Sequence, residues 1–119
     1  MKVAIVGSRN ADHIDIQKMI AYIPENCSEI ISGGADGIDT FAREIAQLLH
    51  LPVREYLPQY DKFGKAAPLE RNKQIAASCD LLLAFWDNHS DGTGHIIAHC
   101  IQTGVPFRII PLDEVRLNP

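Results

Sequence analysis

Residues 31–39, ISGGADGID, decide the fold expected for this chain. The stretch leaves an apolar run through three glycines and enters a segment with the apolar period of a helix. Glycine lets backbone N–H groups approach an anion closely at the positive end of a helix. We therefore expect a strand, a phosphate-binding turn and a helix, with the glycines at the phosphate and the aspartates at sugar hydroxyls or caps. The predicted ligand residues of this turn are Ser32, Gly33, Gly34, Asp36 and Gly37.

The same turn also has an interpretation without a ligand. Asp36 would cap the helix that follows, and Asp39 would complete a capping-box arrangement. The two interpretations are compatible, so the sequence leaves both open.

The rest of the chain repeats this unit. Short apolar runs alternate with longer segments of helical period, which is typical of βα units and a mainly parallel sheet. We expect an α/β fold, a three-layer, Rossmann-like, doubly wound parallel sheet of about five strands. Strands are expected at residues 2–6, 28–32, 53–56, 80–85 and 107–110, and helices at 14–22, 38–50, 69–78 and 93–103. Residues 57–67 are irregular and are a candidate flap over the site.

Length and composition bound the class of protein. With 119 residues, 46% hydrophobic and 22% charged, the chain is expected to form one globular domain over residues 1–119. Its formal charge of -4 weighs against tight binding of a long nucleic acid. Three cysteines, without CxxC spacing or a secretory signal, indicate a reducing cytoplasm. No apolar run is long enough to span a membrane, so no membrane partner is expected.

Residues 86–96, WDNHSDGTGHI, form a second junction between an apolar strand and a helix. N–H groups and hydroxyls at this junction would bind a second phosphate or the other edge of the same one. The predicted ligand residues are Ser90, Gly92, Thr93 and Gly94. Asp91 is a helix cap or an acid/base group, and Trp86 stacks on a base or packs in the core.

Two arginines are the third element of the predicted site. In a doubly wound sheet, ligands bind outside the carboxyl ends of the strands where the strand order reverses, which adds the loop Gly7, Ser8 and Arg9. Arg9 and Arg71 are suited to bidentate contacts with a phosphate. Alternatively, Arg71 pairs with Glu70 or Glu44, and Arg9 is a solvated charge. Glu70 is also the candidate acid or base at this crevice.

A metal site is the weakest of the alternatives. His95 and His99 are one helical turn apart and would bind a metal ion together with Asp91 or His89. Histidines at this spacing more often pack or contact a ligand, so we expect no metal and no cofactor.

Four motifs, in their order along the chain, resemble the SLOG superfamily and, within it, its small YspA- and YpsA-related branch. The motifs are IVGSR at residues 5–9, SGGADGIDTFAREIA at 32–46, PLERNKQIAASCDLLLAFW at 68–86 and SDGTGHIIAHCIQTGVP at 90–106. Relatives include the LOG phosphoribohydrolases and the DNA-processing protein A fold. The resemblance implies a Rossmann-like nucleotide-binding fold. The site residues that it implies are Gly7, Ser8, Arg9, Gly33, Gly34, Gly37, Arg71, Asn72, Gly92 and Thr93.

One departure from the LOG pattern separates the functional hypotheses. The LOG enzymes carry a catalytic glutamate three residues after the threonine of their PGGxGT loop, and Ile96 occupies that position here. An isoleucine cannot act as a nucleophile or stabilise an oxocarbenium-like centre. We therefore expect a module that binds a small nucleotide or nucleotide derivative, as a homo-oligomer. The alternative is an N-glycosidic hydrolase of nucleoside 5′-monophosphates that uses Glu70 and Asp91 as acid and base.

Overall fold

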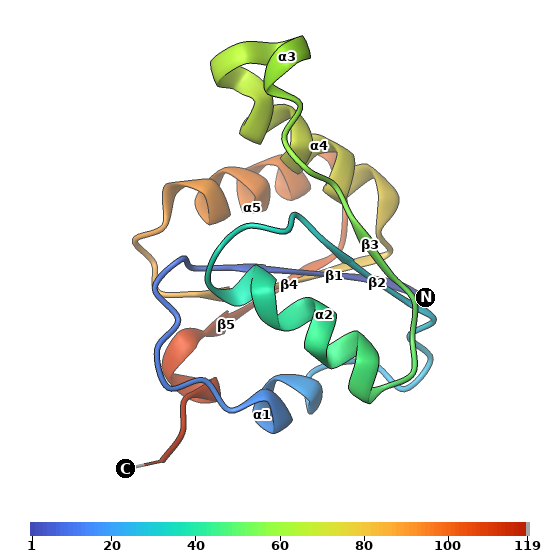
Figure 1. Cartoon of the computed structure of the whole chain (residues 1–119), viewed down its shortest axis with the longest axis vertical. Coiled ribbons are helices and arrows are strands. Elements are labelled where there is room, and N and C mark those ends of the chain that lie inside the picture. The colour runs from blue at the N-terminus through green and yellow to red at the C-terminus, as the bar shows by residue number, and fades with distance from the viewer. Residues whose placement is uncertain (119) are drawn as a thin grey trace.

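Five parallel strands form one sheet at the centre of the structure, a computed structural model that describes residues 1–118. The strands are β1 (Lys2–Gly7), β2 (Glu29–Ser32), β3 (Val53–Glu55), β4 (Leu81–Trp86) and β5 (Phe107–Pro111). Their order across the sheet is β3-β2-β1-β4-β5, so the strand order reverses between β1 and β4 (Figure 1). The doubly wound parallel sheet predicted from the sequence is confirmed.

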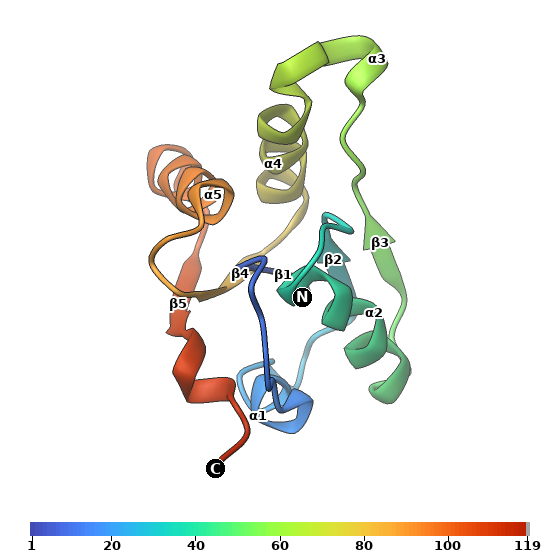
Figure 2. The same ribbon diagram turned by 60° about the vertical axis from the view of Figure 1, so that its left-hand side comes forward.

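Helices cover both faces of this sheet and make three layers (Figures 1 and 2). One face carries α1 (Ile16–Ile20), α2 (Ile38–Leu48) and the short helix η2 (Leu112–Val115), and the other carries α4 (Ala67–Ser78) and α5 (Asp91–Thr103). The alternation of side chains along β1 supplies both cores. Val3 and Ile5 pack with α1 and α2, whereas Ala4 and Val6 pack with α4 and α5.

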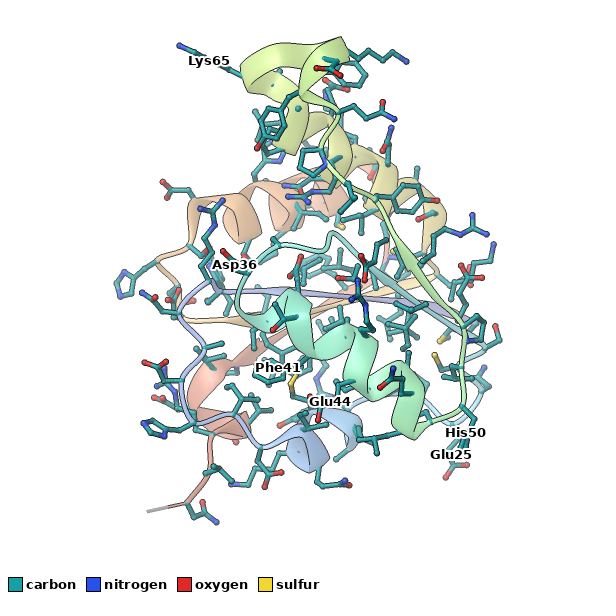
Figure 3. The ribbon with its side chains drawn as sticks, in the orientation of Figure 1. Glu25, Asp36, Phe41, Glu44, His50 and Lys65 are labelled. Carbon is teal, nitrogen blue, oxygen red and sulfur yellow. The ribbon has the colours of Figure 1, made fainter. Side chains whose placement is uncertain are left out.

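The segment between β3 and α4 differs from the prediction of an irregular flap. It contains the single turn α3 (Tyr60–Phe63) followed by the 3-10 helix η1 (Gly64–Ala66). Figures 1 and 2 show this segment projecting beyond the layers, and Lys65 lies at its outer end (Figure 3). α4 then begins at Ala67, two residues earlier than expected, with Pro68 in its first turn.

Helix α1 is shorter than the predicted helix over 14–22, and its start has a clear cause. Asp15 is the N-cap, and its carboxylate accepts a hydrogen bond from Gln17 N at 3.0 Å. Ile14 is instead paired with Arg116 in an isolated antiparallel bridge. The sequence predicted neither this bridge nor η2, because both depend on contacts between distant ends of the chain.

The predicted capping box at the start of α2 is wrong. The N-cap is Gly37, with φ +82° and no side-chain cap, while Asp36 is exposed (Figure 3) and Asp39 is buried. A Cβ at Gly37 would lie 2.2 Å from the backbone oxygen of Ser8. Glycine is therefore required both for the left-handed conformation and for the close approach of two loops.

None of the helices within residues 1–118 is long and apolar enough to cross a membrane.

Gly37→Ala is expected to lower the free energy of unfolding by at least about 2 kcal/mol, because it combines a strained φ with a clash against the Ser8 backbone. Gly104 is the matched control: it has φ +75° but open space around its missing Cβ. Gly104→Ala should cost only about 1 kcal/mol. Urea unfolding of both variants measures the difference, and equal losses would show that the loop contact contributes nothing.

Candidate functional site

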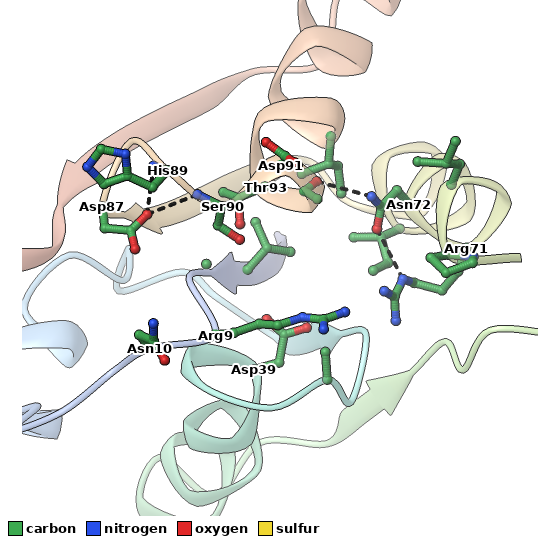
Figure 4. Close-up of a pocket in the computed structure, with 18 residues that line it drawn as sticks. Arg9, Asn10, Asp39, Arg71, Asn72, Asp87, His89, Ser90, Asp91 and Thr93 are labelled. Carbon is green, nitrogen blue, oxygen red and sulfur yellow. Dashed lines mark hydrogen bonds between the residues drawn. The ribbon is translucent and has the colours of Figure 1, made fainter. Parts of the chain in front are cut away.

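A cavity of about 430 Å³ opens at the reversal of strand order, outside the carboxyl ends of β1 and β4. Loops after β1, β2 and β4 and the first turns of α4 and α5 line it (Figure 4). Eight of the predicted site residues line this cavity: Gly7, Arg9, Arg71, Asn72, Ser90, Asp91, Gly92 and Thr93. The structure therefore brings these predicted residues together at one cavity, and their binding roles stay predictions.

Ser8 holds the loops together and does not line the cavity. It is fully buried, and its Oγ accepts a hydrogen bond from Asp87 N at 2.9 Å. Its N–H donates to Phe85 O at 3.1 Å, and its carbonyl accepts from Ile38 N at 3.0 Å. Ser8 thus joins three loops at the edge of the sheet, and its prediction as a ligand contact is wrong.

The loop between β4 and α5 is ordered by Asp87 and Trp86. One carboxylate oxygen of Asp87 accepts hydrogen bonds from His89 N at 2.8 Å and Ser90 N at 3.1 Å. These bonds, first of all that from His89, lower the pKa of Asp87. Trp86 donates from its indole N–H to Ser90 O at 3.0 Å and packs in the core cluster of α4 and α5, beside Gly94. Trp86 thus packs in the core, as one of its two predicted alternatives has it, and a ligand contact of Gly94 stays a prediction.

This loop leaves the start of α5 open toward the cavity. Ser90 is the N-cap, but its side chain makes no capping hydrogen bond. No hydrogen bond within residues 1–118 uses the amides of Asp91, Gly92 and Thr93. A Cβ at Gly92 would meet nothing within 4 Å. The helix therefore presents free donors at the positive end of its dipole.

Arg71 and Asn72 connect the two glycine loops. Arg71 donates from Nη1 to Gly33 O at 2.8 Å and from Nε to Asn72 Oδ1 at 3.0 Å. Asn72 in turn donates from Nδ2 to Gly92 O at 3.2 Å. The predicted alternative, in which Arg71 pairs with Glu70 or Glu44, is not observed: Glu70 pairs with Lys73, and Glu44 lies on α2, across the sheet (Figure 3).

The electrostatics of Arg71 reveal a second cation nearby. Burial lowers the pKa of the Arg71 guanidinium, the charges of Asp39 and Tyr60 raise it, and the like charge of Arg9 lowers it. Arg9 is exposed, lines the cavity and forms no ion pair within residues 1–118 (Figure 4). Guanidinium groups from two separate elements therefore lie at one cavity, together with the buried carboxylate of Asp39.

That carboxylate is Asp39, for which the sequence predicted a sugar contact or a helix cap but not burial. It is 8% exposed and lines the cavity. Burial raises its pKa to about 6, against the lowering effects of Arg71 and of hydrogen bonding to the backbone of Ala35, Gly33 and Gly7. The signal was its position: Asp39, Ala42 and Ala46 have i, i+3, i+7 spacing, which places a carboxylate on the apolar face of α2.

The first glycine loop is consequently occupied from within the chain. Its donors are directed at Asp39, and a Cβ at Gly33 would lie 2.6 Å from Arg71 Nη1 and 3.1 Å from Asp39 Oδ2. The predicted ligand residues that do not line the cavity are Ser32, Gly33, Gly34, Asp36 and Gly37. Their roles as phosphate or sugar contacts stay predictions, and the buried Asp39 carboxylate lies beside this loop.

Two further candidates lose support. Glu70 accepts a hydrogen bond from Lys73 at 3.2 Å and does not line the cavity. Among residues 1–118, no three His, Cys, Asp or Glu side chains come together as a metal site requires. His95 instead lies 3.4 Å from the amide nitrogen of Asn72. Asn10, Asp87 and His89, which were not predicted, line the cavity.

Comparison with known proteins relates this fold to DNA-processing proteins. The family model of DNA recombination-mediator protein A matches residues 1–51. The X-ray structure of DNA processing protein A from Streptococcus pneumoniae is similar, with a TM-score of 0.68 and 22% identity over 96% of this chain and 52% of that chain. This chain thus spans about half the length of that relative, and no curated protein matches it. The Rossmann-like fold expected from the four motifs is confirmed, and it is similar to that of DNA processing protein A.

The pKa of Asp39 predicts a pH dependence of stability. Because its pKa of about 6 lies above the ordinary 3.8, the folded state holds this proton more tightly than the unfolded state. The stabilisation is complete below about pH 4 and is lost as the pH rises through about 6. The free energy of unfolding of Asp39→Asn minus that of the native chain should therefore rise by up to about 3 kcal/mol between about pH 4 and about pH 7.

Urea unfolding across this pH range measures the effect, with Asp36→Asn as the control because Asp36 is exposed. The change with pH is the readout, since an Asn at position 39 also alters the local hydrogen bonds at every pH. Parallel stability curves for Asp39→Asn and the native chain would contradict the raised pKa.

Proposed function

We propose that the cavity binds a small phosphorylated ligand of the nucleotide type, with its phosphate at the start of α5. The observation that carries the proposal is the convergence of the free amides of residues 91–93 with the guanidinium groups of Arg9 and Arg71 on one cavity. Two positive charges that lie close together are stabilised by a bound anion. The end of a helix supplies N–H donors to the same anion.

The volume of the cavity limits the ligand to about one nucleotide. Pockets for small molecules usually enclose about 300–1,000 Å³. At about 430 Å³, the cavity lies toward the lower end of that range. Apolar side chains of Val6, Ile75 and Ile96 line part of it and supply a surface for a base or sugar. This favours a mononucleotide over a dinucleotide.

The fold comparison raises a second candidate, binding of single-stranded DNA. The names of the matching family and of the solved protein refer to DNA recombination and DNA processing. A formal charge of -4 opposes binding to many phosphates, because such binding needs several cations to displace counterions. A nucleotide at the end of a strand would make the same contacts as a free mononucleotide, so an oligonucleotide belongs in the binding experiment.

The N-glycosidic hydrolase remains a weaker proposal. Of its two predicted carboxylates, only Asp91 lines the cavity, because Glu70 is paired with Lys73. Release of free base from a nucleoside 5′-monophosphate, lost in Asp91→Asn, would establish this activity.

Calorimetry is the direct test of the binding proposal. Adenosine 5′-monophosphate should bind more tightly than adenosine, and Arg9→Ala should weaken the monophosphate about tenfold while leaving adenosine nearly unchanged. Arg43→Ala is the matched control, since Arg43 is exposed on α2 and pairs with Glu55 away from the cavity. If neither mononucleotides nor a short single-stranded oligonucleotide bind below about 1 mM, the proposal fails.

A further inference from the structure

The two ends of the cavity are suited to different groups of a ligand. At one end lies the Asp39 carboxylate, more than nine-tenths buried, toward which the backbone of Ala35, Gly33 and Gly7 donates. With a pKa of about 6, this group is predominantly an anion at neutral pH. The donors of the first glycine loop are therefore already matched to a negative charge that belongs to the chain.

At the other end, polar groups have no partner within residues 1–118. The amides of residues 91–93 are free, and Thr93 lines the cavity with only 4% of its surface exposed. Helix amides without a partner are available to a ligand that accepts hydrogen bonds at this end of the cavity.

The two arginines of the cavity also differ in whether other groups of the chain bind them. Arg71 is engaged with Gly33 O and Asn72 Oδ1 and faces Asp39, whose charge raises the pKa of its guanidinium. Arg9 forms no ion pair within residues 1–118. A second anionic group placed near Asp39 would meet a carboxylate and a guanidinium whose donors are partly engaged. Like charges that lie close together repel each other.

We propose that Asp39 makes the cavity selective for ligands with one anionic group and a pair of hydroxyl donors, as in a ribonucleoside 5′-monophosphate. The phosphate lies at the start of α5, and the ribose hydroxyls donate to the Asp39 carboxylate. A ligand with a further phosphate on its ribose is rejected. This inference rests on the function proposed above and assigns its specificity to one residue.

The test compares three ligands in calorimetry on the native chain: adenosine 5′-monophosphate, its 2′,3′-dideoxy analogue and adenosine 3′,5′-bisphosphate. Loss of both hydroxyls should weaken binding about tenfold or more, because each hydrogen bond to a charged group is strong. The 3′-phosphate should also weaken binding about tenfold or more. Equal or tighter binding of either analogue overturns the proposed selectivity.

Asp39→Asn identifies the residue responsible. In this variant, the preference for adenosine 5′-monophosphate over each of the two analogues should fall to about threefold or less. The exposed control Asp36→Asn should keep both preferences. Preferences that survive in a folded Asp39→Asn protein overturn the role of Asp39. If that variant does not fold, Asp39→Glu, which keeps the charge but moves it by one methylene, should lower affinity for the ribonucleotide more than for the dideoxy analogue; equal losses overturn the role.

The outcomes separate this inference from the function on which it rests. Tight binding of the monophosphate without discrimination against the dideoxy analogue leaves the binding function intact and removes only the selectivity. Failure of all three ligands to bind below about 1 mM removes both.

Discussion

The hydrogen bonding of Ser8 is the constraint on which the rest of this site depends. Its N–H, carbonyl and hydroxyl each bind a different part of the chain: Phe85 at the end of β4, Ile38 at the start of α2, and Asp87 in the loop that leads to α5. All three partners lie at the point where the strand order reverses. These bonds stabilise the fold, because leaving a buried donor or acceptor without its partner costs about 1–3 kcal/mol.

Two glycines allow this arrangement. A Cβ at Gly7 would lie 2.3 Å from Phe85 O, and a Cβ at Gly37 would lie 2.2 Å from Ser8 O. Gly7 and Gly37 thus allow separate segments of the polypeptide to come into contact. Their sequence pattern resembles a phosphate-binding turn because both structures require the close approach of bare backbone.

Much of the fold could be predicted because its signals are local. The apolar runs and the glycine-rich junctions placed all five strands and the edge of the sheet at which the cavity opens. The errors share a physical cause. Asp39 was predicted to be a cap or a sugar contact, whereas its burial beside Arg71, which is far away in sequence, could not be predicted from local spacing. For Trp86 the sequence left base stacking and core packing open, and its indole N–H donates to Ser90 O while its ring packs against the core.

The predicted site residues that line the cavity with free amides are placed there by backbone position. Gly92 and Thr93 lie in the first turn of a helix after a strand, and that position alone gives them free amides. Residues whose function depends on a side-chain partner, such as Glu70 with Lys73, could not be assigned from spacing. A carboxylate at a position on the apolar face of a predicted helix is the sequence pattern that would have identified Asp39 as buried.

The cavity is lined by residues from Val6 to Ile96, so its walls come from most of the length of the chain. No short fragment contains them all, and the unfolded chain has no counterpart of the cavity. Any molecule that occupies it therefore stabilises the entire domain, by about 2.7 kcal/mol when its free concentration is about a hundred times its dissociation constant. The thermal midpoint of unfolding thus responds to occupancy, and a shift in melting temperature reports a ligand whose chemical identity is still unknown.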